Sequence, residues 1–194
     1  MSATATISTT NDTFSVRNPG ALFHRDRLEM MGWMTGGMVL ASVSAAALWY
    51  GLPTAVAAAD PIARTGQVLT YTMLPGAAVL ASVCTCFRMF DTLHAMNPLG
   101  KSDDESNFYR INNRILTNTV EQALIFLPAL LALGFLLEGP MFHALPVLAG
   151  TWGIGRLAFW IGYQAHMPAR GIGMVTTLMA AFGAYGLAAF TILG

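Results

Sequence analysis

Four polar or charged side chains recur at helical spacing in a stretch of the sequence that is otherwise largely apolar. They are Arg110, Arg114, Asn118 and Glu121. Offsets of four, four and three residues put all four along one face of a helix. The guanidinium group of arginine can donate two parallel hydrogen bonds to a carboxylate, so two arginines on one face favour the binding of an anionic molecule.

A second group of polar residues lies nearer the C-terminus. Arg156 and Tyr163 are seven residues apart and therefore share a helix face. Arg170 comes just after Pro168, where another apolar stretch begins. At the N-terminus of a helix, Arg170 would be joined by a helix dipole that also favours anions. We expect the two groups to meet in one inward-facing, positively charged cluster.

A purely structural role for these residues is the alternative. Glu121 could pair with Arg114 or Arg156 to lock the helices together. Arg110 and Arg170 could instead extend to lipid headgroups. One acid cannot neutralise three buried arginines, however, and an ionisable residue inside a membrane span is costly and by default marks a functional site. The surplus of positive charge therefore favours a binding site for an anion.

The elements that carry these residues are predicted to be membrane-spanning helices. Hydrophobic residues make up 55% of the 194 residues and charged residues only 10%, whereas about 25% of a soluble domain is charged. Residues 30–59, 66–87 and 171–194 contain no charge, and 122–137 and 139–164 are apolar except for His143 and Arg156. A span needs about 20 apolar residues, and these runs lack the alternation of β-barrel strands. The sequence therefore predicts an all-α integral membrane protein.

Five spans are expected, and the basic residues orient them. The spans lie at 31–51, 66–88, 111–137, 141–165 and 171–192. Most basic residues flank the same ends of these spans, namely Arg17, Arg25, Arg27, Arg88, Lys101, Arg110, Arg114 and Arg170. By the positive-inside rule, the N-terminus and the loop 89–110 then lie in the cytoplasm and the C-terminus lies outside.

The chain divides into three predicted parts. They are a disordered cytoplasmic tail at 1–28, an additional transmembrane helix at 29–60 and a four-helix membrane domain at 61–194. A cleaved signal peptide that ends near Ala55–Ala58 is the alternative for the first span.

Small residues recur every four positions at Ala180, Ala184 and Ala188, which predicts close packing of the last helix in the bundle.

At these polar residues the sequence resembles the MAPEG family, the membrane-associated proteins of eicosanoid and glutathione metabolism. The resemblance extends over about 108–187 and rests on three short motifs. They are Arg114-Ile-Leu-Thr-Asn118-Thr-Val-Glu121, Gly155-Arg156 followed by Gly162-Tyr163, and Arg170-Gly171 after a short turn. The resemblance implies a homotrimer of four-helix protomers, with glutathione bound between neighbouring subunits. We expect a bacterial-type member in the inner membrane, with its site facing the cytoplasm.

The resemblance also implies a role for each matching residue. Glutathione would be bound by Arg114, Asn118, Glu121, Arg156 and Tyr163. Arg170 would be the catalytic residue that faces its sulfur. A positive charge within about 4 to 6 Å lowers the pKa of an acidic group by about 1 to 3, so Arg170 would hold the thiol as a nucleophilic thiolate. The arginines would bind the carboxylates, whereas Glu121 would either accept the ammonium group or orient an arginine.

These roles predict a membrane-bound glutathione transferase or peroxidase, with glutathione as co-substrate. A lipophilic electrophile or hydroperoxide would reach the sulfur from the membrane lipids. The alternatives are a noncatalytic relative that binds lipids or acts as a scaffold, and a transporter or an accessory subunit of a larger membrane complex. Pro75 and Pro128, which are expected to interrupt two helices, are the sole hint of a transporter. Phe159 and Gln122 stand where some members that make leukotrienes carry tyrosines, which argues against that substrate class.

Other features of the sequence do not predict a site. The four histidines show no metal-ligand spacing, so we expect no metal. The net charge of zero and the absence of a run of lysines or arginines argue against binding to nucleic acid. Met30, Met31, Met34 and Met38 form a cluster at helical spacing, which we attribute to packing.

Overall fold

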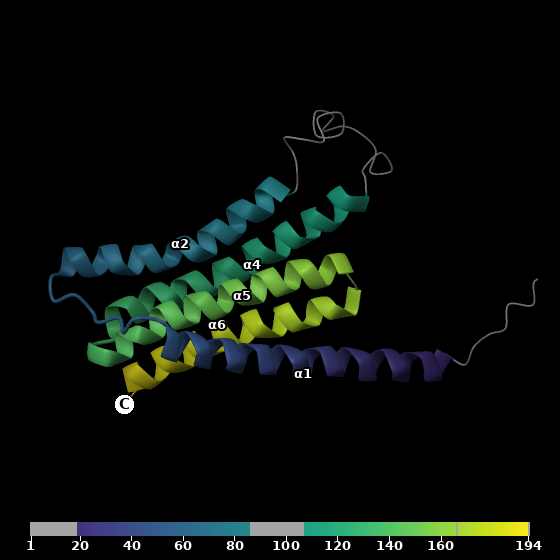
Figure 1. Ribbon diagram of the computed structural model, residues 1–194, viewed down its shortest axis with the longest axis horizontal. Coiled ribbons are helices and arrows are strands. Elements are labelled where there is room, and N and C mark those ends of the chain that lie inside the picture. The colour runs from purple at the N-terminus through teal and green to yellow at the C-terminus, as the bar shows by residue number, and fades with distance from the viewer. Residues whose placement is uncertain (1–18, 86–106, 166, 194) are drawn as a thin grey trace, which may run out of the picture.

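The computed structural model describes residues 19–85, 107–165 and 167–193. Within them the chain forms five long helices and two short 3-10 turns (Figure 1). The long helices are α1 (Pro19–Gly51), α2 (Pro61–Thr85), α4 (Asn107–Leu136), α5 (Ala144–Ala165) and α6 (Arg170–Leu193), and the turns are η2 (Gly139–His143) and η3 (Met167–Ala169). The predictions for the tail up to residue 18 and for most of the loop 89–110 lie outside the described residues.

The long helices lie side by side, and each runs antiparallel to the one before it in the chain (Figure 1). The N-terminal ends of α1, α4 and α6 and the C-terminal ends of α2 and α5 therefore meet at the same end of the bundle. Arg114 and Arg170 lie near this end, which we call the arginine end. The alternation agrees with the predicted order of the spans.

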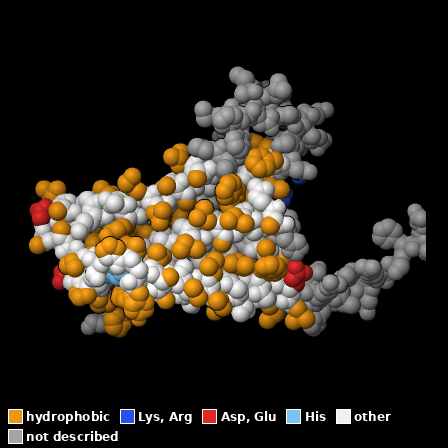
Figure 2. All heavy atoms as spheres, viewed as in Figure 1, with side chains coloured by type: hydrophobic (Ala, Val, Ile, Leu, Met, Phe, Trp, Pro, Cys, Tyr) orange, Lys and Arg blue, Asp and Glu red, His pale blue; other side chains and the backbone are white. Residues whose placement is uncertain are grey.

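Four stretches of helix are long and apolar enough to cross a membrane. They are Arg27–Gly51, Phe108–Leu136, Gly139–Ala165 and Arg170–Leu193. The remaining predicted span, 66–88, corresponds to α2, which is not among these four stretches and which packs against α4 and α5. Figure 2 shows hydrophobic side chains over the length of the visible face, with acidic side chains near its two ends. The predicted all-α membrane bundle is confirmed, and α1 precedes the four helices of the predicted 61–194 domain.

Pro75 and Pro128 do not break their helices. Pro75 lies inside α2 and Pro128 lies inside α4, and both helices continue past the proline. In a membrane bundle, neighbouring groups and small local adjustments can compensate for the backbone hydrogen bond that a proline removes. The expectation of interrupted helices is therefore wrong, and the hint of a transporter that it supplied is lost.

The hydrophobic core lies toward the end of the bundle opposite to the arginine end. Phe126 and Leu130 on α4, Trp152 on α5 and Ala184 on α6 are completely buried. The rings of Phe126 and Trp152 stack with their centroids 5.6 Å apart. This core holds the helices together at one end and leaves room for a cavity at the other.

Glycines allow α5 and α6 to approach each other closely. A Cβ atom on Gly173 would overlap the backbone of Phe159, and one on Gly155 would lie 2.9 Å from the backbone nitrogen of Thr177. Further along α6, Ala180 and Ala184 are buried in the same bundle. The predicted close packing of small residues is confirmed, because Ala180, Ala184 and Ala188 are buried and there is no space for a larger side chain at Gly155 and Gly173.

Helix α1 is packed into the bundle through its own small residues. A Cβ atom on Gly37 would lie 2.5 Å from the carbonyl oxygen of Ile172 on α6. The hydroxyl of Thr176 donates to the carbonyl oxygen of Gly37 over 3.0 Å. One helical turn or so further on, Ala41 and Ser44 are buried as well. A fixed contact of backbone against backbone thus positions α1 beside the start of α6.

His143 ties the far end of α1 to the rest of the bundle. Its side chain is only 3% exposed. The backbone N–H of Ala55 donates to Nδ1 over 3.1 Å, so the ring proton resides on Nε2. Nε2 can then donate to the carbonyl oxygen of Trp49, 3.0 Å away. Both ring nitrogens are therefore satisfied by the segment that ends α1 and leads to α2.

We expect His143→Phe to lower the thermal stability of the purified protein. The phenyl ring preserves most of the side-chain volume but leaves the half-buried N–H of Ala55 without its acceptor, and the net loss of a hydrogen bond costs about 0.5–1.5 kcal/mol. Thermal unfolding in detergent would measure the difference. Thr191→Val, which removes a hydroxyl on α6 that bonds only to Leu187 of its own helix, is the control and should have a smaller effect. A His143→Phe protein as stable as the wild type would contradict this role.

Candidate functional site

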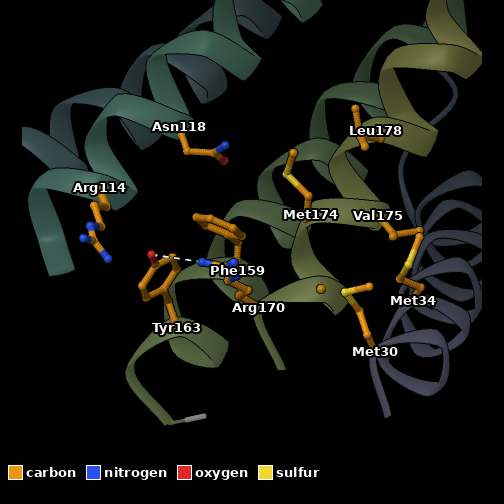
Figure 3. Close-up of a pocket in the computed structure, with 11 residues that line it drawn as sticks. Met30, Met34, Arg114, Asn118, Phe159, Tyr163, Arg170, Met174, Val175 and Leu178 are labelled. Carbon is orange, nitrogen blue, oxygen red and sulfur yellow. Dashed lines mark hydrogen bonds between the residues drawn. The ribbon is translucent and has the colours of Figure 1, made fainter. Parts of the chain in front are cut away.

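A cavity of about 460 Å³ opens at the arginine end of the bundle (Figure 3). Ligand pockets in proteins typically have volumes of about 300–1,000 Å³. Helices α1, α4, α5 and α6 all contribute to its wall. The described residues that line it are Met30, Met34, Arg114, Asn118, Phe159, Tyr163, Arg170, Gly171, Met174, Val175 and Leu178.

One half of this cavity is polar. Arg114 and Asn118 reach it from α4, Tyr163 from α5 and Arg170 from the start of α6 (Figure 3). Arg170 Nη1 donates to the phenol oxygen of Tyr163 over 3.1 Å. The guanidinium carbon also lies 5.0 Å from the centroid of the Tyr163 ring. Because the oxygen of Tyr163 already accepts a bond, its own O–H remains free to donate to a ligand.

The position of Arg170 follows from the local sequence. The turn η3 contains Pro168, and α6 begins at Arg170 directly after it. A Cβ atom on Gly162 would lie 2.7 Å from the carbonyl oxygen of Ala169, so the end of α5 passes against this turn. The close approach brings Tyr163 beside Arg170. The unpaired N–H groups of the first turn of α6 add a partial positive charge at the same place.

Arg156 lies behind the cavity wall and does not line the cavity itself. Its side chain is 5% exposed. Nη1 donates to Asn118 Oδ1 and Nη2 donates to Thr177 Oγ1, both over 2.9 Å. These bonds connect α4, α5 and α6. They also orient Asn118, because an oxygen held by Arg156 leaves the amide NH₂ group to donate into the cavity.

The polar half of the cavity presents hydrogen-bond donors and positive charge. The two guanidinium groups belong to Arg114 and Arg170, and none of the described lining residues is acidic. Arg114 makes no hydrogen bond to another described residue, so its donors are available to a ligand. Such a surface suits a molecule with carboxylates or another anionic group.

The comparison with known families agrees with these observations. Residues 39–190 match the sequence model of the MAPEG family. The chain belongs to the MAPEG family. The match extends from the middle of α1 to near the end of α6, so it includes the cavity-lining parts of α4, α5 and α6 but not Met30 and Met34 on α1. Comparisons with curated proteins and with solved structures found no match. MAPEG proteins are membrane proteins of glutathione-related metabolism, and the resemblance seen in the sequence is confirmed.

The structure brings together four of the six residues that the sequence analysis predicts to bind or activate glutathione. These four line the cavity and are Arg114, Asn118, Tyr163 and Arg170. Arg156 reaches the cavity only through Asn118, and it lines a second space of about 90 Å³ between α2, α4 and α5. Glu121 is exposed outside the cavity and makes no hydrogen bond to a described residue. Within the single chain, Glu121 therefore orients none of the described arginines.

The apolar half of the cavity includes residues that we did not predict to line a site. Met30 and Met34 come from α1, and Met174, Val175 and Leu178 come from α6. The spacing of the two α1 methionines was visible in the sequence, but helical spacing is the same for packing, lipid-facing and cavity-lining residues.

Within the described residues, no group of three or more His, Cys, Asp or Glu could hold a metal ion.

Proposed function

We propose that this MAPEG protein is a glutathione transferase or peroxidase that binds glutathione in the cavity and holds its thiol as a thiolate. The observation that carries the proposal is the polar half of the cavity, in which two guanidinium groups, an amide and a phenol converge with no acid among the described lining residues. Glutathione has two carboxylates and an ionisable thiol. A cavity that offers donors and positive charge is complementary to all three groups.

In this proposal, each polar residue contacts a particular part of glutathione. Arg114 and the amide of Asn118 bind carboxylate oxygens, and Arg156 holds Asn118 in the donating orientation. The thiolate lies against Arg170, the O–H of Tyr163 and the N-terminus of α6, where the positive charge and the helix dipole both favour an anion. Arg170 is the catalytic residue because it contacts the reacting sulfur.

The apolar half of the cavity then receives the second substrate. For a transferase, the thiolate attacks an electrophilic carbon, a C–S bond forms, and the leaving group departs with the electron pair. For a hydroperoxide, the sulfur takes the terminal oxygen, the O–O bond breaks, and the alkoxide takes a proton to form an alcohol. A second glutathione then converts the sulfenic acid to glutathione disulfide and water. Both reactions need a thiolate that is shielded from bulk water.

The proposal includes the assembly and the location of the protein. Arg114 and Glu121 are exposed on α4, so both are available to a neighbouring chain in a homotrimer, where Glu121 would accept the ammonium group of glutathione. The distribution of basic residues in the sequence supports an orientation with the arginine end facing the cytoplasm, in a bacterial inner membrane. Glutathione would then enter from the cytoplasm and the electrophile from the lipids.

The test is to titrate glutathione into the detergent-purified protein and to record thiolate absorbance in the ultraviolet. We expect a saturable increase at neutral pH, because the cavity favours the charged form of the thiol. S-Methylglutathione has no ionisable thiol and is the control, which should compete with glutathione but add no absorbance. Binding of both compounds without any thiolate would indicate a noncatalytic relative. Absence of saturable binding would overturn the proposal.

A further inference from the structure

We infer that α1 supplies part of the binding site for the electrophile, and that Met30 and Met34 limit the size of the apolar group the site accepts. This inference rests on the proposed function and names the residues that would select the second substrate. Both methionines line the same cavity as Arg170. In Figure 3 they lie across the cavity from Arg114, with Arg170 and Met174 between them.

The arrangement places the two halves of the cavity on either side of Arg170. Arg114, Asn118 and Tyr163 form the polar side, whereas the wall beyond Arg170 consists of Met30, Met34 and residues of α6 (Figure 3). A sulfur held at Arg170 would therefore have the carboxylate-binding groups on one side and the methionines on the other. A group bonded to that sulfur and directed away from Arg114 points toward α1.

The α1 wall is held at a fixed distance from α6. Gly37 lies one turn after Met34 and contacts Ile172 and Val175 so closely that a Cβ atom would not fit. The hydrogen bond from Thr176 to the Gly37 carbonyl oxygen joins the helices at the same level. On the other side of Met34, the Cβ atom of Trp33 lies 3.5 Å from the position that a Cβ atom on Gly171 would take. The methionines therefore cannot move away with α1 as a whole when a ligand binds.

The side chains themselves suit an apolar group of variable shape. Methionine is unbranched, has three rotatable bonds and carries a polarisable sulfur, so it adapts to aliphatic chains and aromatic rings. Met34 is 44% exposed and Met30 is 51% exposed, which leaves them accessible to a molecule in the cavity. We assign the site to electrophiles with an unbranched aliphatic or an aromatic group, in which the length of that group sets the fit.

The test uses binding and does not depend on catalysis. A series of S-alkylglutathiones from methyl to octyl would be titrated into the intact protein by calorimetry. Each buried methylene contributes about 0.8 kcal/mol, which is about a fourfold gain in affinity. We expect the affinity of the wild type to rise about fourfold with each added methylene until the alkyl chain reaches the α1 wall. In Met34→Trp the rise should end at a shorter chain, so that octylglutathione binds at least tenfold more weakly than it binds the wild type.

The matched control is Met38→Trp. Met38 lies one turn further along α1, is 52% exposed and is not among the residues that line the cavity. Its profile of affinity against chain length should equal that of the wild type, and S-methylglutathione should bind all three proteins equally. If Met34→Trp does not fold, the double variant Met30→Ala with Met34→Ala should shift the profile toward longer chains. The inference would be overturned if the variant that folds had the wild-type profile of affinity against chain length. It would also be overturned if Met34→Trp and Met38→Trp changed that profile equally.

The outcomes separate this inference from the proposed function. A chain-length profile that depends on Met34, in a protein that forms no thiolate, would support the apolar subsite and reject the catalytic activity. If the protein forms a glutathione thiolate but its profile of affinity against chain length is the same with and without Met34, the result would support the activity and reject the role of α1.

Discussion

Replacing Arg170 by alanine should abolish the thiolate absorbance of bound glutathione at neutral pH while leaving most of the binding intact. The guanidinium group lies against Tyr163 at the start of α6, where the proposal places the sulfur. Loss of its charge should raise the pKa of the bound thiol by about 1 to 3, toward the value of about 8.5 for a free thiol. The thiolate is the form present above the pKa. The variant should therefore show it only at alkaline pH, whereas the wild type should lose it only as the solution is acidified.

Two further arginine variants on α4 separate this effect from a general loss of positive charge. Arg114→Ala should weaken the binding of glutathione itself, because Arg114 lines the cavity and its proposed partner is a carboxylate. Losing one such charged hydrogen bond costs about 1.5–3 kcal/mol, or about 10- to 150-fold in affinity. Arg110→Ala removes an exposed arginine that is not among the lining residues and should change neither property. Equal behaviour of the Arg170 and Arg114 variants would contradict the assigned roles.

Replacing Gly173 by alanine should both destabilise the bundle and disable the site. The new Cβ atom would overlap the backbone nitrogen of Phe159, and backbone cannot turn aside as a flexible side chain can. The helices must then separate, and overpacking of this kind costs about 1–3 kcal/mol or more. Gly173 lies three residues after Arg170, and Phe159 lies four residues before Tyr163. The separation would therefore pull apart Arg170 and Tyr163, which are proposed to contact the sulfur, and the thiolate signal should fall sharply.

A glycine further along the same helix provides the control. A Cβ atom on Gly186 would meet nothing within 4 Å, so Gly186→Ala should be tolerated and should leave the thiolate unchanged. Thermal unfolding and glutathione titration of both variants would measure the two effects. If Gly173→Ala is as stable and as active as Gly186→Ala, the close contact of α5 and α6 is not what positions the site.

The apolar stretches were enough to predict the helices, because a bilayer leaves few other ways to satisfy a backbone. The polar half of the cavity was partly predictable as well. Arg114 and Asn118 share a face by their spacing, and Pro168 indicates the helix start that places Arg170. Both conclusions follow from local geometry, in which the position of a side chain depends on its own helix alone.

The direction of Arg156 could not be predicted in this way. Its spacing from Tyr163 indicates a shared face, yet its guanidinium group turns to Asn118 and Thr177, on two other helices. A buried guanidinium must find acceptors where there is no water, and which acceptors are near depends on how three helices pack. The same limit applies to Met30 and Met34, because only the position of α1 beside α6 makes them part of a cavity.

The two ends of the bundle are held together in different ways. Phe126, Leu130 and Trp152 bind the helices at one end, whereas the arginine end contains the cavity and is held across α4, α5 and α6 by the two hydrogen bonds of Arg156. Local opening costs less free energy than global unfolding where few buried apolar contacts must be broken. Local opening at the arginine end should therefore cost less free energy than global unfolding, while α1 stays fixed against α6 at Gly37.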